Sequence, residues 1–406
     1  MAYSLFNVYG VEMEYMIVDR STLAVKPIAD ELLRSMAGDW VSDVENGTID
    51  WSNELVNHVV EIKTHRPEPS LLGLEKPFHA NVQQINQQLQ AFDAMLLPTG
   101  AHPLMDPFTE TRLWPHEHKE IYNLYNRIFD CRGHGWSNLQ STHINLPFSG
   151  DAEFRQLHAA IRLLLPIIPA LSASTPILDG KDSGFRDMRL ETYRFNQKRI
   201  PIIAGSVIPE PVFSQQAYHE HIFHPIRTAI APFDTENILD QHFLNSRGAI
   251  ARFDRGAIEI RIIDIQECPL ADISILLLIS SCLQKLVSQD WADTEAQSRW
   301  GEQELAEIFL DVIRDGEDTP IRNKAYLALL ACQDPSLTAG ELWQHLFERL
   351  SPALPEPYAG TIGQILKEGT LSSRILRRLR GDVSPPAIRE QYFLLSQCLQ
   401  ENRLYV

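Results

Sequence analysis

Apolar and polar residues alternate along four stretches in the first two thirds of the chain. These stretches are rich in β-branched and aromatic residues, which is typical of strands that bury one face. We therefore predict strands at residues 6–19, 55–64, 139–147 and 250–265.

Two longer stretches between these strands place apolar residues at helical spacing, which predicts helices at residues 71–96 and 151–171. Pro166 and Pro169 should kink or end the second helix, because proline lacks an amide hydrogen and its ring clashes with the preceding turn. Strands and helices interspersed in this way predict an α+β fold.

The pattern changes near residue 270, after which the apolar spacing is almost entirely helical. We predict helices at residues 271–289, 302–314, 321–332, 339–350 and 386–402, and we find no repeat of fixed period. This organisation predicts an α+β domain over residues 1–290 and a helical C-terminal region, residues 291–406, that packs on it.

The charge balance argues against a nucleic-acid-binding protein. Acidic residues number 53 against 36 lysines and arginines, giving a formal net charge of -17. Binding to nucleic acid needs a basic surface that neutralises many phosphates. Hydrophobic residues at 44% and charged residues at 22% are ordinary for a globular protein.

The five cysteines, at positions 131, 268, 282, 332 and 398, are widely spaced and form no CxxC pair. This pattern favours neither a disulfide framework nor a zinc ribbon, so a reducing cytoplasm is expected. The first ten residues lack a basic start followed by an apolar run, and polar residues interrupt the apolar stretches. We therefore expect no export and no membrane insertion.

Each predicted strand also carries chemically active side chains on one face, because alternate strand residues point the same way. Glu12 and Glu14 share a face in the first strand, and Asn57 and Glu61 in the second. The third strand groups Ser141, His143 and Asn145, and the fourth groups Glu259 and Arg261. Such a layout is expected of a sheet that lines an active-site funnel with its polar face.

Each strand taken alone has a plainer explanation. Paired glutamates can solubilise an edge strand, and a lone strand histidine is more often hydrogen-bonded than metal-bound. Arg252, Arg255 and Arg261 could neutralise nearby acids in a structural network. Asp264, which points away from Glu259 by alternation, is expected to be structural.

The segments GVEMEY, VVEIKT, STHIN, LSASTPILDGKDSGFRDMR and AIEIRIID occur in the order seen in glutamate-cysteine ligase type 2 proteins, and the resemblance spans roughly residues 8–290. It implies a glutamine-synthetase-like fold: a curved, mainly antiparallel sheet, covered by helices, whose concave polar face binds ATP, divalent cations and an acid substrate. Residues 1–290 would then form the catalytic domain.

The resemblance also implies roles for individual residues. The metal-binding positions, which would hold Mg2+ or Mn2+, match Glu12, Glu14, Glu61, His143 and Glu259. Catalytic arginines near the transferred phosphate match Arg261 and Arg252, and an arginine near substrate carboxylates matches Arg189. Two positions depart from the family pattern: Ser141 stands where relatives often have a first histidine, and Asn57 where another acid is expected.

The expected reaction is ATP-dependent joining of a glutamate-like acid to an amine. A carboxylate is a poor acyl donor at neutral pH, so ATP would convert it to an acyl phosphate that the amine attacks. The chain has no GxxxxGK[ST] phosphate loop, so cations and arginines would hold the phosphates. A ligase with another acid or amine, a noncatalytic nucleotide-binding homologue and a homo-oligomer are left open by the sequence.

The histidine-rich segment at residues 112–122 lacks an HExxH zinc motif and is expected to contribute a wall of the acceptor site. A second one, at residues 218–224, is expected to begin a helix with a solvated face. We assign it no site.

Overall fold

The computed structural model describes residues 3–406, and the centre of this part of the chain is an eight-stranded antiparallel sheet. The strands follow one another in the order β2-β3-β4-β1-β6-β10-β9, and β5 pairs with β1 beyond the end of β4. Short β7–β8 and β11–β12 ribbons lie outside this sheet. The strands are β1 (Gly10–Asp19), β2 (Asp43–Val44), β3 (Ile49–Asn53), β4 (Val59–Thr64), β5 (Ala94–Leu97), β6 (Ser141–Pro147), β7 (Ile177–Leu178), β8 (Lys181–Asp182), β9 (Ala249–Arg252), β10 (Ala257–Asp264), β11 (Pro320–Ile321) and β12 (Leu337–Thr338).

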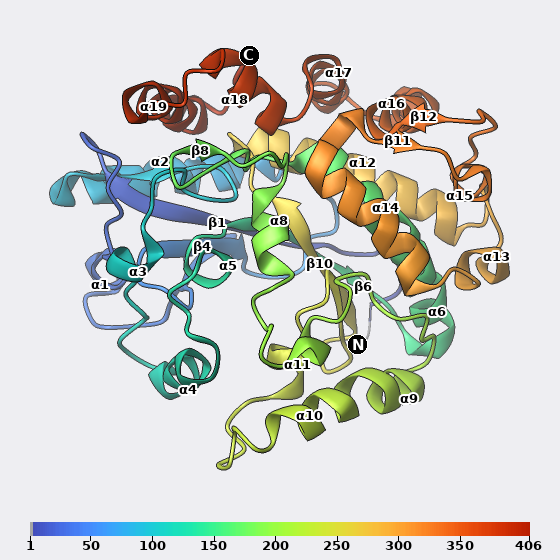
Figure 1. Cartoon of the computed structure of the whole chain (residues 1–406). Coiled ribbons are helices and arrows are strands. Elements are labelled where there is room, and N and C mark those ends of the chain that lie inside the picture. Colours follow the sequence, from blue (N-terminus) through green and yellow to red (C-terminus); the bar gives the residue numbers. More distant parts are fainter. Residues whose placement is uncertain (1–2) are drawn as a thin grey trace.

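The helices surround this sheet (Figure 1). They are α1 (Ala29–Ala37), α2 (Glu75–Leu89), α3 (Pro107–Glu110), α4 (Lys119–Phe129), α5 (His134–Ser137), α6 (Gly150–Leu164), α7 (Pro169–Ser172), α8 (Met188–Tyr193), α9 (Gln215–Tyr218), α10 (His224–Ile230), α11 (Gln241–Leu244), α12 (Pro269–Val287), α13 (Thr294–Ser298), α14 (Glu302–Asp315), α15 (Lys324–Leu329), α16 (Ala339–Leu350), α17 (Tyr358–Glu368), α18 (Leu371–Leu379) and α19 (Pro385–Glu401).

The apolar face of the sheet builds the main hydrophobic core. Val11, Met13, Tyr15 and Ile17 alternate along β1 and are completely buried there. Helix α12 contacts both α2 and α6, and all three contribute apolar side chains to the same core. Burial of this face fixes the register of each strand, because a slip of one residue would exchange the core and polar faces.

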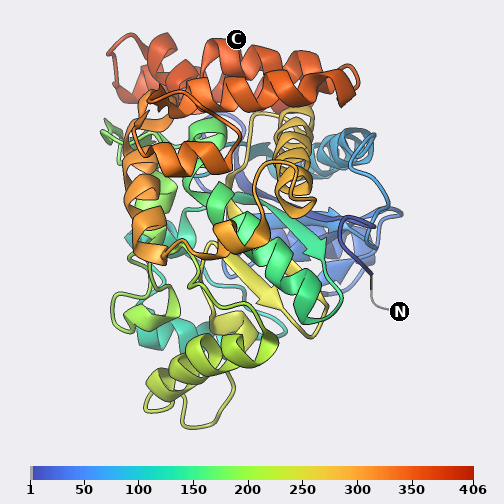
Figure 2. The ribbon, with the colours of Figure 1, turned by 90° about the vertical axis from the view of Figure 1, so that its right-hand side faces the viewer.

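A smaller second core covers one end of the opposite face. Met16 and Val18 follow Glu12 and Glu14 on the same side of β1, but they are buried against apolar residues of α18 and α19, including Ile375. These C-terminal helices lie together along one end of the molecule, opposite α9 and α10 (Figure 2). They therefore limit the polar face to the first half of β1.

The domain boundary expected at residue 290, between the α+β domain and the helical C-terminal region, stays a prediction.

Helix α12 is long and apolar enough to cross a membrane by length and composition, with a mean hydropathy of 1.8. About 67% of its apolar window is buried inside the fold, and α12 contacts α2, α6, α16 and α17. Its apolar character is thus accounted for by its place in the core, where a helix is apolar all round.

Several predicted elements have different limits in the structure. The helix predicted at residues 71–96 is shorter in the structure. Its last predicted residues belong to strand β5, which follows a turn at Asp93 with φ of 52°. The strand predicted at residues 250–265 is two strands, β9 and β10, joined by a turn, and that predicted at 55–64 begins only at Val59. Strand β3 and helices α17 and α18 were not predicted. The break expected at Pro166 and Pro169 is confirmed, because α6 ends at Leu164 and α7 begins at Pro169.

Candidate active site

A cleft of about 670 Å3 opens over the polar face of the sheet. The eight residues proposed from the sequence all line it: Glu12, Glu14, Glu61, His143, Arg189, Arg252, Glu259 and Arg261. The structure therefore brings together side chains that are up to 249 positions apart, from Glu12 to Arg261.

Strand register sets these residues side by side. Glu14 lies directly opposite Glu61 of β4, and Glu12 lies opposite His143 of β6. Glu259 of β10 lies opposite Asn145, two residues beyond His143. Directly opposed residues of antiparallel strands point to the same face, so four neighbouring strands present one continuous acidic surface.

Protein hydrogen bonds orient three of the acidic side chains. Glu12 accepts bonds from Asn145 Nδ2 at 3.0 Å and from His143 Nδ1 at 3.0 Å. Glu14 Oε2 accepts from the backbone N of Ser141 at 2.7 Å and from its hydroxyl at 3.0 Å. Glu61 Oε1 accepts from Ser52 Oγ at 2.8 Å and from Lys63 Nζ at 3.1 Å.

Gly10 makes room for this arrangement. A Cβ atom at residue 10 would stand 3.1 Å from the Cβ of Asn145, the strand neighbour that holds Glu12. A larger residue would push Asn145 away from Glu12. The glycine that opens the GVEMEY segment thus serves packing at the site.

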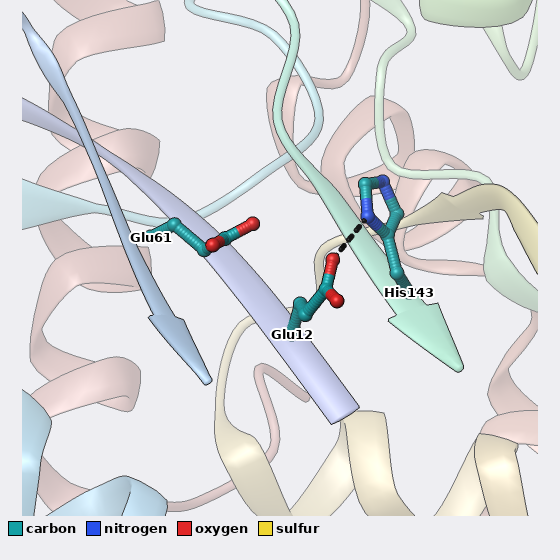
Figure 3. Close-up of side chains that lie close together, drawn as sticks. All are labelled: Glu12, Glu61 and His143. Atoms are coloured by element: carbon teal, nitrogen blue, oxygen red, sulfur yellow. Dashed lines mark hydrogen bonds and ion pairs between the residues drawn. The ribbon is translucent and has the colours of Figure 1, made fainter. Parts of the chain in front are cut away.

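Two groups of potential ligands share one carboxylate. Ligand atoms of Glu12, Glu61 and His143 lie within 4.8 Å of one another, and so do those of Glu14, Glu54 and Glu61. Figure 3 shows Glu12, Glu61 and His143 projecting to the same side from three adjacent strands. Glu61 belongs to both groups and would be a ligand of a cation held by either one.

Burial and mutual repulsion shift the pKa values of these groups. Burial, together with the charge of Glu12, raises the pKa of Glu61 to about 7, and burial next to Glu61 and Glu14 raises that of Glu54. Burial opposes ionisation of His143, but its hydrogen bond to Glu12 and the charges of Glu14 and Glu12 raise its pKa to about 9. Burial likewise opposes ionisation of Glu12, yet His143 lowers its pKa to about 2.

The side chains present fit divalent cations. Carboxylate oxygens with one imidazole are hard ligands of the kind that suit Mg2+ and Mn2+. Carboxylates that raise one another's pKa in a buried cleft are stabilised by any cation that replaces a proton among them. Glu259 is engaged differently: it is ion-paired with Arg261, and its Oε1 lies 4.0 Å from His143 Nδ1.

Glu54 is a site residue that the strand pattern missed. It lies in the connection between β3 and β4, where side-chain alternation does not apply. Asn57, taken in the sequence as sharing the face of Glu61, instead precedes β4 and lies outside the cleft. Its amide binds Pro27 O and Asp30 Oδ1, both at 2.9 Å, and holds the start of α1. Asn57 therefore does not share the polar face with Glu61, and the nearby carboxylate in the cleft is that of Glu54.

Ser141 also has a defined place beside the acidic groups. Its hydroxyl donates to Glu14 and lies 2.8 Å from His143 Nε2. With its proton on Glu14, Ser141 Oγ accepts from Nε2, while His143 Nδ1 faces Glu12. Both ring nitrogens then carry protons, in agreement with the raised pKa of His143.

Arg189 is positioned by Asp264, which contributes a buried carboxylate. A register shift in β10 after Ile260 sets Asp264 opposite Ser141, so its direction is not that expected from simple alternation. Asp264 pairs with Arg189 Nε and accepts a hydrogen bond from the backbone N of Ser174 at 2.8 Å. The structural role predicted for Asp264 agrees with these contacts. Arg189 Nη2 is buried and has no hydrogen-bond partner among residues 3–406.

The two predicted phosphate-binding arginines differ in their surroundings. Arg261 pairs with Glu259, and although burial opposes its charge, Glu259 and Tyr193 raise its pKa. Arg252, at the end of β9, binds Asp254 through Nη2 at 3.0 Å. Arg255 also lines the cleft but is 63% exposed at its side chain. Positive charge is therefore present both at the centre of the cleft and at its rim.

The cleft has an aromatic wall, which we define as Tyr122, Tyr125, Trp136 and Phe243. Tyr122 and Tyr125 come from α4, Trp136 from α5 and Phe243 from α11. Tyr122 is the last residue of the histidine-rich segment 112–122 and is the residue of that segment that lines the cleft. A role of this segment in the acceptor site stays a prediction.

We predict that divalent cations bind more tightly as pH rises from 6 to 9, by up to about tenfold per pH unit for each proton displaced. The reason is that Glu61, with a pKa near 7, and His143, with a pKa near 9, must lose protons to act as ligands. Titration calorimetry with Mn2+ in two buffers of different ionisation enthalpy measures the protons released. Binding without proton release would contradict this coupling.

We predict that Glu54→Gln weakens Mn2+ binding by at least about 10-fold with little change in melting temperature. Asn57→Ala provides the matched control, because it should destabilise the fold by about 1 to 3 kcal/mol and leave Mn2+ affinity unchanged. Calorimetry and thermal melting of both variants check this. If Asn57→Ala weakened Mn2+ binding and Glu54→Gln did not, residue 57 rather than Glu54 would be the ligand.

A family model described as glutamate-cysteine ligase family 2 matches residues 8–392. A protein of Archaeoglobus fulgidus, whose name assigns no activity, is 32% identical over 402 residues, which cover 98% of this chain and 100% of that protein. A Rubrobacter xylanophilus protein provisionally named glutamate–cysteine ligase 2-3 is 24% identical over 231 residues, 54% of this chain and 55% of that protein. The chain therefore spans about half the length of this named relative.

A solved structure, glutamate-cysteine ligase from Francisella tularensis in complex with AMP, matches with a TM-score of 0.60 at 12% identity. The match covers 100% of this chain and 91% of that chain. At this identity the likeness concerns the fold alone, and it confirms the glutamine-synthetase-like fold class expected from the sequence.

Proposed function

Because the chain belongs to glutamate-cysteine ligase family 2, we propose that it is a carboxylate-amine ligase that uses ATP to activate a glutamate-like carboxylate for attack by an amine. The observation that carries this proposal is that two groups of potential cation ligands in the cleft have Glu61 in common. Arg261 lines the same cleft. The substrates are proposed to be small molecules.

Bound Mg2+ or Mn2+ would neutralise the repulsion between triphosphate and carboxylate oxygens and polarise the transferred phosphoryl group. The residues proposed to hold these ions are Glu12, Glu14, Glu54, Glu61 and His143, with Glu259 beside them. Ser141, Ser52 and Asn145 keep three of these carboxylates oriented before any ligand arrives.

The arginines are proposed to act on the oxyanions. Arg261 would stabilise charge on the phosphoryl group during transfer, and Arg252 would bind phosphate oxygens at the rim, since guanidinium groups match oxyanions bidentately. Arg189 is proposed to bind a substrate carboxylate, because it lines the cleft and its Nη2 has no hydrogen-bond partner among residues 3–406. Its pairing with Asp264 keeps that nitrogen in place.

Two chemical steps follow from these roles. The acid's carboxylate oxygen attacks the γ-phosphorus of ATP, which releases ADP and leaves an acyl phosphate. The amine nitrogen then attacks the acyl carbon, the bond to the phosphate oxygen breaks, and inorganic phosphate leaves as the nitrogen loses a proton.

The proposed location is the cytoplasm. All five cysteines are buried free thiols, which supports a reducing compartment.

Incubating the protein with ATP, Mg2+ or Mn2+ and a panel of acids and amines tests the activity. We expect ADP and an amide, both detected by mass spectrometry, only when acid and amine are present together. Nucleotide and cation binding without any product across a broad panel would instead favour a noncatalytic homologue.

We predict that ATP binding depends on divalent cation, because the triphosphate cannot approach the acidic face without charge compensation. ATP affinity should fall when EDTA is added. Adenosine is the matched control, because it has no phosphates and its affinity should be the same in both conditions. Equal ATP affinity with and without EDTA would contradict the role of the acidic face.

We predict that Glu259→Gln and Arg261→Ala both abolish most turnover while the fold stays intact. Arg261→Ala should lower kcat by roughly 100-fold or more without a comparable loss of cation affinity. Glu259→Gln should make the residual activity depend more steeply on cation concentration.

Thermal melting of these two variants separates catalysis from stability. If the pair served the fold alone, breaking it would cost about 3 to 5 kcal/mol of unfolding free energy. Variants that melt much earlier but keep normal specific activity in their folded fraction would overturn the active-site assignment of β10.

A further inference from the structure

The aromatic wall of the cleft has no part in holding cations, phosphate or the acid. Its rings come from three separate segments, α4, α5 and α11, and meet in edge-to-face pairs: Tyr125 lies 5.0 Å from Phe243 and 5.4 Å from Trp136, between ring centroids. Phe129 stacks behind Trp136 at 5.6 Å. Such a cluster makes a rigid apolar surface at low entropic cost.

The polar atoms of these rings are already engaged with the protein. Trp136 Nε1 donates to Asn196 O at 3.2 Å, and the Tyr125 hydroxyl donates to Phe243 O at 3.4 Å. The Tyr122 hydroxyl accepts from Asn53 Nδ2 at 3.2 Å. The wall therefore offers mainly ring carbons to a ligand.

Phe243 is the most exposed ring of the wall, because Tyr125 is buried and Tyr122 and Trp136 are half-buried. Phe243 is 45% exposed, whereas Tyr125 is 3% exposed. An exposed phenylalanine in the lining of a concave site is the kind of apolar surface that a ligand covers.

The aromatic wall lines the same cleft as the acidic residues and Arg261. Tyr122 is bonded to Asn53, the residue before Glu54 of the acidic group. Tyr125 lines the same cleft as Tyr193 and Arg261. A molecule that packs on the wall therefore occupies the cleft in which the acyl phosphate is proposed to form.

We propose that the amine acceptor carries an aromatic or similarly flat apolar group that packs on the aromatic wall, which is an inference that rests on the proposed function. A cysteine acceptor has a single thiol-bearing carbon and no ring to pack on the exposed Phe243. An arylalkylamine has a flat ring that can pack on Phe243, joined by a flexible stem to its amine nitrogen.

The test uses three nucleophiles with ATP, Mg2+ and glutamate, or another acid that the panel identifies. Hydroxylamine has no apolar group that could pack on the aromatic wall, so the rate of hydroxamate formation measures activation of the acid alone. Phenethylamine and ethylamine form a matched pair that differs by one aromatic ring. We expect kcat/KM for phenethylamine to exceed that for ethylamine, and that for cysteine, by roughly 10- to 100-fold.

Phe243→Ala should reduce the preference for phenethylamine over ethylamine by about fivefold or more and leave hydroxamate formation unchanged. Phe195→Ala is the control, because Phe195 is 50% exposed but lies outside the cleft. It should leave both quantities unchanged.

The outcomes distinguish this inference from the proposed function. Hydroxamate without a preference for phenethylamine, or a preference that Phe243→Ala does not alter, overturns the inference alone. If neither hydroxamate nor amide forms with any acid in the panel, the result contradicts both the proposed function and this inference.

Discussion

Repulsion between carboxylates on one buried face is the constraint on which the rest of this structure depends. Glu14 faces Glu61 directly across β1 and β4, and Glu54 and Glu12 lie close to the same pair. Taking such charges out of water costs several kcal/mol each unless they are compensated. Within the protein, His143 and Lys63 compensate part of this charge, and protons on Glu54 and Glu61 relieve more, as their raised pKa values indicate. Under the proposed function, cations would replace those protons and compensate the remaining negative charge.

The fold supplies the rigidity that this crowding requires. The completely buried opposite face of β1, packed under α2, α6 and α12, fixes the strand register, and the register decides which side chains meet. Short polar residues then hold the acids by one oxygen each, as Ser52 does for Glu61 and Ser141 for Glu14. A site that is ordered before its ligands arrive loses less free energy when it binds them.

Much of this arrangement can be predicted from the sequence, because alternation within a strand is local. The two-residue period places Glu12 with Glu14, and Glu259 with Arg261, on a shared face of their strands, and the family resemblance predicts that these faces meet at one site. Glu54 could not be found in that way, since it lies in the turn of a hairpin whose first strand, β3, has no clear apolar pattern. The direction of Asp264 was also unpredictable, because it depends on a register shift in β10 that is set by pairing with β6. The cover of Met16 by α19 and the aromatic wall depend on contacts between distant segments.

The central claim is that the acidic face and Arg261 serve phosphoryl transfer to a carboxylate. Transfer of oxygen from the acid to phosphate tests it most directly. Glutamate labelled with 18O in its carboxylates is incubated with the protein, ATP, Mg2+ and hydroxylamine, and the released phosphate is analysed by mass spectrometry. An acyl phosphate route predicts one 18O atom in each phosphate, because the bond between acyl carbon and oxygen breaks when the amine attacks. Phosphate without label, or release of AMP in place of ADP, would contradict the account.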